Sequence, residues 1–181
     1  MRATIVFTVT LASVAGAGAA AAQEMAHQHH SAAGIASIQP LWERVKDLYT
    51  RSAEQSPESF FAYRPTASVR TFAEMLGHVI NEHYLFCASA LGEDDPNTTD
   101  FEETTSKADL TKALAASFAY CDRAYAMAES KAMEETSLFG QTGSRLWVLI
   151  FNVTHDSEHY GNIVTYMRMS GMVPPSSQGG M

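Results

Sequence analysis

Three histidines in this sequence are spaced so that they could bind one metal ion. His155 and His159 stand four residues apart in the segment HDSEH. In a helix this spacing places both side chains on one face, about 6 Å apart along the axis. His78 lies in another stretch of helical spacing, among apolar residues where an imidazole without a partner is costly. A third imidazole from a facing helix would complete one face of a coordination sphere and leave the other positions open for water or a substrate.

The spacing alone leaves a structural explanation open, because two histidines four residues apart also occur as a solvated or core pair. Glu82, one helical turn after His78, is the candidate catalytic residue: it could act as an acid or base, orient a ligand imidazole, or face solvent. His83 lies about 140° around the helix from His78, so we expect a surface or boundary position. Asp156 lies about 100° around the helix from His155, and we expect it to be solvated.

Four stretches with apolar residues at helical spacing would position these side chains, and almost no strand pattern is present. Thr71 and Glu74 form a capping-box pattern at the start of the second stretch, and Gly171 is a natural end for the fourth. Four amphipathic helices in one small domain predict an all-α four-helix bundle over residues 35–175. The stretches cover about residues 35–54, 71–91, 106–130 and 144–170.

The N-terminus has the pattern of a secretory signal peptide over residues 1–22: a basic residue, a short apolar stretch and small residues before Gln23. We therefore expect export, to a periplasm, and no stable membrane insertion after cleavage, since the apolar stretch is too short to span a bilayer. Residues 23–34, with His27, His29 and His30, and residues 176–181 should be flexible. The formal charge of −8 and the lack of a basic run disfavour nucleic-acid binding.

Cys87 and Cys121 are the two cysteines of the chain, and each falls inside a predicted helix. Export would permit a disulfide between them. If the two helices are adjacent and antiparallel, however, the cysteines lie at heights that differ by roughly 10 Å. We therefore expect two separate, buried, apolar side chains. A shift in helix register would erase that gap, so the disulfide stays open as the alternative.

Two segments, TFAEMLGHVINEHYLF and HDSEHYGNIVTYMRMSGMVPPSS, resemble the DinB/YfiT-like family of metalloenzymes. The resemblance spans about residues 38–177. It implies a four-helix bundle, a mirror variant of simple up-and-down topology, in which three histidines bind a divalent metal in a cleft between helices. On this resemblance the ligands are His78, His155 and His159. Imidazole ligands suit zinc, nickel, iron, manganese and copper and do not choose among them.

The resemblance implies a metal-dependent enzyme that acts on a small molecule, a thiol or an electrophile. Thiol S-transferases and isomerases belong to the family, and metal-assisted hydrolysis with Glu82 as a base fits export about as well. The alternatives are a non-catalytic periplasmic metal-binding or stress-response bundle, and a metal that only fastens two helices together. Glu74, Glu82 and Asn152 favour a polar cleft over the last of these. Pairing of family members through their helices suggests a homodimer.

Overall fold

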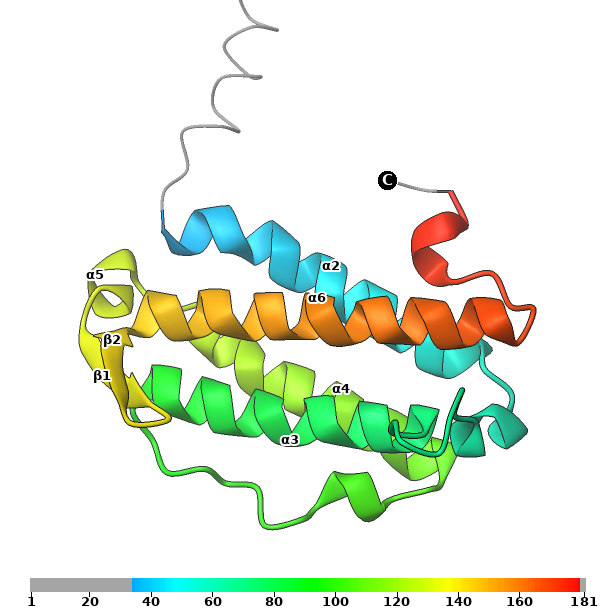
Figure 1. Ribbon diagram of the computed structural model, residues 1–181. Coiled ribbons are helices and arrows are strands. Elements are labelled where there is room, and N and C mark those ends of the chain that lie inside the picture. The colour runs from blue at the N-terminus through cyan, green and yellow to red at the C-terminus, as the bar shows by residue number, and fades with distance from the viewer. Residues whose placement is uncertain (1–33, 180–181) are drawn as a thin grey trace, which may run out of the picture. The chain divides into compact units, whose positions relative to one another are not determined.

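The computed structural model of the protein describes residues 34–179, and four long helices make up most of that part of the chain (Figure 1). They are α2 (Ile35–Gln55), α3 (Phe72–Leu91), α4 (Lys107–Tyr125) and α6 (Arg145–Met169). Both α3 and α2 pack against α4 and α6, so that the four helices enclose one core. The predicted all-α four-helix bundle is confirmed. The expected signal peptide and the lead-in up to residue 33 lie outside the described residues.

Local sequence signals set the ends of the two helices that carry the histidines. The Thr71 hydroxyl accepts a hydrogen bond from the backbone N–H of Glu74 (3.1 Å), and the Glu74 carboxylate accepts one from the N–H of Thr71 (2.6 Å). This is the predicted capping box, and it starts α3. Gly92 and Gly171, with φ of 74° and 76°, follow the ends of α3 and α6. These left-handed conformations cost glycine little, which explains why the two helices stop there.

A short β-hairpin between α4 and α6 differs from the all-helical expectation. α4 ends earlier than expected and is followed by the short helix α5 (Glu129–Ala132). Strands β1 (Glu135–Leu138) and β2 (Gln141–Ser144) then pair in antiparallel fashion. Phe139 and Gly140 join them with φ of 51° and 73°, the two positive values that a tight two-residue hairpin turn uses. Strands of four residues are too short to show a clear alternating pattern in the sequence.

Short 3-10 helices lie in the connections: η1 (Glu58–Ala62), η2 (Phe101–Glu103) and η3 (Pro175–Ser177). Phe60 and Phe61 of η1 are buried and belong to the hydrophobic core. η3 begins the segment for which we expected a flexible tail. The Gln178 side chain donates hydrogen bonds to the Gln55 side chain (2.7 Å) and to the Val173 carbonyl (2.8 Å). The described part of this segment is therefore held against the end of α2.

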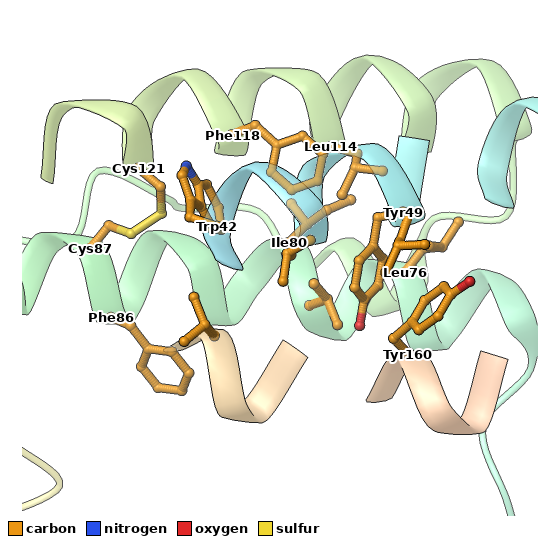
Figure 2. Packing of buried hydrophobic residues seen from close by; sticks show 14 of the residues in the cluster. Trp42, Tyr49, Leu76, Ile80, Phe86, Cys87, Leu114, Phe118, Cys121 and Tyr160 are labelled. Carbon is orange, nitrogen blue, oxygen red and sulfur yellow. A yellow bond between two sulfur atoms is a disulfide. The ribbon is translucent and has the colours of Figure 1, made fainter. Parts of the chain in front are cut away.

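The core contains a disulfide bond that joins α3 to α4 (Figure 2). Cys87 and Cys121 are both fully buried, and their Cα atoms are 5.3 Å apart. The expectation of two separate thiols is therefore wrong. That expectation estimated the relative heights of the two cysteines from the helical rise per residue alone. A long connection that includes η2 separates α3 from α4, so the rise per residue does not determine their register. Side-chain packing then sets the register, and it places the two cysteines at the same height.

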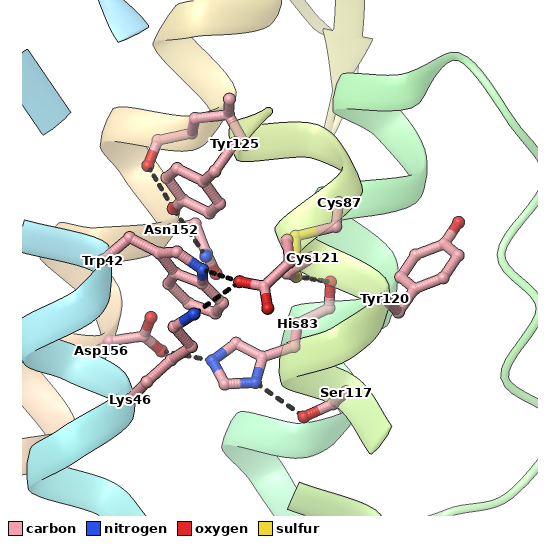
Figure 3. Close-up of a disulfide and its surroundings, with 12 residues drawn as sticks. Trp42, Lys46, His83, Cys87, Ser117, Tyr120, Cys121, Tyr125, Asn152 and Asp156 are labelled. Atoms are coloured by element: carbon pink, nitrogen blue, oxygen red, sulfur yellow. Dashed lines mark hydrogen bonds and ion pairs between the residues drawn. A yellow bond between two sulfur atoms is a disulfide. The ribbon is translucent and has the colours of Figure 1, made fainter. Parts of the chain in front are cut away.

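A polar network lies beside the disulfide, between α3, α4 and α6 (Figure 3). His83 is completely buried, and its ring nitrogens have two oxygen partners: Ser117 Oγ lies 3.0 Å from Nδ1, and Asp156 Oδ1 lies 3.1 Å from Nε2. The surface position expected for His83 and the solvated position expected for Asp156 are both wrong. The reason is that α3 and α6 each pack against two other helices and so bury more than one face.

Within residues 34–179, no helix is both long and apolar enough to cross a membrane.

Candidate metal centre

The packing of α3 against α6 brings the three predicted histidines together. His78 comes from α3, and His155 and His159 come from successive turns of α6. Each of the three offers a ring nitrogen, and these nitrogens all lie within 4.8 Å of one another. The Nε2 atoms of His155 and His159 are 3.0 Å apart. All three residues are partly exposed, so the cluster lies at the edge of the core and not inside it.

The donor set fits a divalent cation. The Nδ1 atoms of His155 and His159 are buried and have no hydrogen-bond partner within residues 34–179, and the two Nε2 atoms point at each other. Burial, followed by the neighbouring His159 and His78, lowers the pKa of His155 to about 3. Burial and His78 also lower the pKa of His159 below its usual value. Both imidazoles are therefore neutral at pH 7, the form that binds a metal, and a cation between the Nε2 atoms would give both lone pairs a partner.

Glu102 is the functional residue that the sequence analysis missed. Its Oε1 lies 2.9 Å from Nδ1 of His78, which leaves Nε2 of His78 to face the other two histidines. Arg70 holds the same carboxylate through Nε (2.8 Å) and Nη2 (3.3 Å). Burial raises the pKa of Glu102, but the hydrogen bonds from Arg70 and His78 outweigh it and bring this pKa below its usual value. A carboxylate on the outer nitrogen of a ligand imidazole fixes its tautomer and orientation.

The sequence offers only a weak signal for Glu102, which follows His78 by 24 residues in an acidic connection. The connection is fastened to α3 by Asn81, whose amide donates to Asp100 (2.8 Å) and whose carbonyl accepts from the N–H of Phe101 (3.1 Å). Asp100 in turn accepts a hydrogen bond from the N–H of Glu102 (3.0 Å). These contacts return the chain to α3 and aim Glu102 at the histidine.

Glu82, the candidate catalytic residue, is half-buried on α3. None of the hydrogen bonds within residues 34–179 joins it to His78, whose Nδ1 is taken by Glu102. The carboxylate that contacts His78 is therefore Glu102 and not Glu82, and a role for Glu82 as an acid or base stays a prediction. Burial raises the pKa of Glu82, while the nearby His78 acts in the opposite direction. A raised pKa suits a carboxyl group that exchanges protons near neutral pH.

A cavity of about 620 Å³ opens beside His159. Asn162 and Tyr166, one and two turns further along α6, line it, as their shared face with His159 suggests. Of the three residues expected in a polar cleft, Glu74 lines this cavity, but Glu82 and Asn152 do not. Asn152 lies in the core. Its side chain is fully buried and donates a hydrogen bond to Tyr125 (2.9 Å). The remaining polar lining comes from the segment before α3, from α3 itself and from η2: Arg64, Ser68, Arg70, Glu74 and Glu102.

The other side of the cluster is aromatic. The His155 ring lies 5.3 Å from the Phe86 ring and 6.2 Å from the Phe151 ring, measured between centroids. Phe139, at the turn of the hairpin, lies 5.8 Å from Phe86 and is 64% exposed. The three histidines therefore stand between an apolar wall near His155 and a polar cavity near His159.

Comparison with known proteins agrees with this fold. The family model of the DinB superfamily matches residues 41–163, which is most of the bundle. The chain belongs to the DinB superfamily. All three histidines fall within the matched residues, as do Glu82 and Glu102. A comparison with curated proteins finds no match.

Two crystal structures of DinB-like proteins have a similar fold. One, from Bacillus cereus ATCC 10987, is 14% identical with a TM-score of 0.69, and the match covers 81% of this chain and 96% of that one. The other, from Bacillus subtilis, is 21% identical with a TM-score of 0.57, and the match covers 75% of this chain and 93% of that one. At these identities the likeness shows the DinB fold, and the chemistry of the site must be argued from its own residues.

Proposed function

We propose that this chain is an exported DinB protein that binds one divalent metal ion through His78, His155 and His159 and uses it to catalyse a reaction of a small molecule. The observation that carries the proposal is the convergence of three ring nitrogens within 4.8 Å beside an open cavity. A metal that only fastened α3 to α6 would need no adjoining cavity. The cavity therefore favours catalysis over a purely structural metal.

In this proposal the metal ion and the residues around it have different roles. A divalent ion supplies Lewis-acid chemistry, since it favours deprotonation of a water or thiol and polarises carbonyl groups. Imidazoles bind a metal in their neutral form, so three of them would leave the charge of such an ion intact. Glu102 accepts a hydrogen bond from Nδ1–H of His78, which would keep the lone pair of Nε2 available for the ion. Glu82 lies one helical turn from His78, and its raised pKa supports a role in which it would take up or return a proton.

Two reaction types agree with this arrangement: transfer or isomerisation that depends on a small thiol, and hydrolysis by an activated water. The disulfide between Cys87 and Cys121 supports an oxidising compartment and hence export. Export weakens the case for a cytosolic thiol as co-substrate. Hydrolysis therefore fits this protein about as well as a thiol-dependent reaction does. The alternative function is a non-catalytic periplasmic protein that holds a metal or takes part in a stress response.

Elemental analysis of the native protein beside His78→Ala and His159→Ala variants tests the metal site. We expect about one metal ion per native chain and none in either variant, with helical content unchanged by circular dichroism. His83→Gln is the matched control, because this histidine of α3 faces away from the site and should leave the metal content unchanged. Full metal content in both alanine variants would overturn the proposal.

A panel of esters, and of thiols with electrophiles, then tests catalysis in the metal-loaded protein. His155→Ala sets the background rate. Glu82→Gln should retain the metal and lose most of the activity, because it removes the proton acceptor and leaves the ligands in place. If the native protein consumes no member of the panel faster than His155→Ala does, the non-catalytic alternative is favoured.

A further inference from the structure

The cavity beside His159 contains two of the few basic side chains of this acidic protein. The sequence has 12 lysine and arginine residues against 20 acidic ones. Arg64 and Arg70 both line this one cavity, together with His159. Their side chains are 39% and 40% exposed, so a small molecule can reach the guanidinium groups. A pair of arginines beside a metal centre suggests recognition of an anionic group, since guanidinium binds carboxylates with defined geometry.

The segment that carries the two arginines is fixed in place. Tyr166 of α6 donates a hydrogen bond to the backbone carbonyl of Arg70 (2.9 Å), and the N–H of Phe72 donates one to the carbonyl of Tyr63 (2.9 Å). Within the segment, Arg64 donates to the carbonyl of Val69 (3.3 Å). The backbone on both sides of the arginines is therefore tied to the bundle. Such preorganisation lowers the entropic cost of binding a ligand there.

The charges around the cavity also favour an anion. Arg64 pairs with Glu74 (3.2 Å) and Arg70 pairs with Glu102 (2.8 Å), so each arginine is balanced by a carboxylate in the free protein. A divalent ion at the three histidines would add two positive charges to this balance and leave an excess of positive charge beside the cavity. A carboxylate in the cavity would neutralise this excess.

We propose that this cavity binds a small molecule with a carboxylate group, and that Arg64 and Arg70 hold the carboxylate while the rest of the molecule reaches toward His159 and the metal. The inference rests on the proposed function, because it places the substrate beside the metal ion. Binding of a carboxylate to Arg70 would also affect the metal centre. A ligand carboxylate on Arg70 would compete with Glu102, which holds His78, so ligand binding and the metal centre are coupled through one side chain.

Calorimetric titration with glutarate tests the proposal, with the neutral glutaramide as its matched control. The native chain, with its disulfide intact, is titrated in the zinc-loaded and the metal-free form. We expect one glutarate per chain, and binding at least about tenfold weaker in Arg64→Gln and in Arg70→Gln, the loss typical of a charge-assisted hydrogen bond. Arg123→Gln is the control variant: this exposed arginine of α4 pairs with Glu93, away from the cavity, and should change glutarate binding less than about twofold.

The outcomes separate this inference from the proposed function, because the zinc content of every sample is measured. Normal zinc content with equal glutarate affinity in the native protein and both cavity variants overturns the anion site and leaves the metal site standing. Equal binding of glutaramide and glutarate also overturns it. If the native protein binds no zinc, the proposed function fails, and the arginine dependence of glutarate binding in the metal-free protein still decides for or against the carboxylate site.

Discussion

Two clusters of polar side chains connect α3 to α6, and they differ in how completely their histidines are satisfied. In the metal centre, the Nε2 atoms of His155 and His159 face each other at 3.0 Å, and their buried Nδ1 atoms have no partner within residues 34–179. In the buried network, both ring nitrogens of His83 have an oxygen within 3.1 Å, from Ser117 and from Asp156. The first cluster borders an open cavity, and the second is completely buried.

The comparison shows that neighbouring positions in the sequence can serve different purposes. His83 follows His78 by five residues, and Asp156 is adjacent to His155. In the buried network both ring nitrogens of His83 have partners in the protein, although Asp156 Oδ2 has none within residues 34–179, and we expect the cluster to stabilise the bundle. In the metal centre the ring nitrogens of three histidines converge to within 4.8 Å of one another. Incomplete partners beside solvent therefore distinguish a binding site from a structural network.

The strongest test of this distinction removes a ligand from the metal centre. His155→Ala should weaken metal binding by at least about 100-fold, because two imidazoles from different helices remain and ion affinity depends on the number of deprotonated ligands. The free energy of unfolding of the metal-free variant should stay near that of the metal-free native protein. Titration with a competing chelator measures the affinity, and urea unfolding measures the stability. A variant that binds metal as tightly as the native protein would show that the cluster is not the binding site.

The opposite result is expected for the buried network. His83→Ala leaves Asp156 without its partner in the core, and should lower the free energy of unfolding by about 3–5 kcal/mol. The metal-to-protein ratio of the folded fraction should not change. Ser117→Ala is the milder control and should cost about 1–2 kcal/mol, since it removes a neutral hydroxyl that contacts His83 Nδ1 (3.0 Å) and donates a hydrogen bond to the carbonyl of Leu114 (2.9 Å). A loss of metal in His83→Ala at temperatures where it is folded would contradict the separation of the two clusters.

The disulfide adjoins the buried network, because Cys121 Sγ lies 3.2 Å from the carbonyl oxygen of His83. We therefore expect it to stabilise the bundle and to leave the metal centre unaffected. Replacing Cys87 and Cys121 together by alanine should lower the free energy of unfolding by about 2–4 kcal/mol, as the crosslink closes a loop with a sequence separation of 34. Metal affinity should be unchanged in the folded protein. Urea unfolding with and without a reductant measures the effect. A reductant that destabilises the double variant as much as the native protein would rule out the disulfide as the cause.

Features that depend on neighbouring residues could be predicted from the sequence. The capping box of Thr71 and Glu74 involves one turn of helix, so the start of α3 follows from the sequence alone. The placement of His155 and His159 on one face follows from helical periodicity in the same way. The resemblance to the DinB family added His78, which spacing alone could not assign to the same site.

Features that depend on packing between distant segments could not be predicted. The contact between Cys87 and Cys121 requires the register of α3 and α4, which a long connection leaves to side-chain packing. The burial of His83 depends on which helices flank α3. Glu102 reaches His78 only because its connection folds back on α3, and helical periodicity contains no information on such a return.

Glu102 provides the test with the smallest expected effect. It contacts a histidine of the metal centre but would not itself be a metal ligand, and it is not part of the buried network. Glu102→Gln keeps the shape of the side chain but removes its charge, so His78 loses a charged acceptor at Nδ1. We expect metal affinity to fall by about tenfold, the lower end of what loss of such a supporting carboxylate causes. Glu103→Gln, at the exposed neighbouring position, is the matched control and should bind metal like the native protein. Chelator competition on the three proteins measures the difference. Equal affinities for all three would mean that Glu102 stabilises the connection and does not support the metal centre.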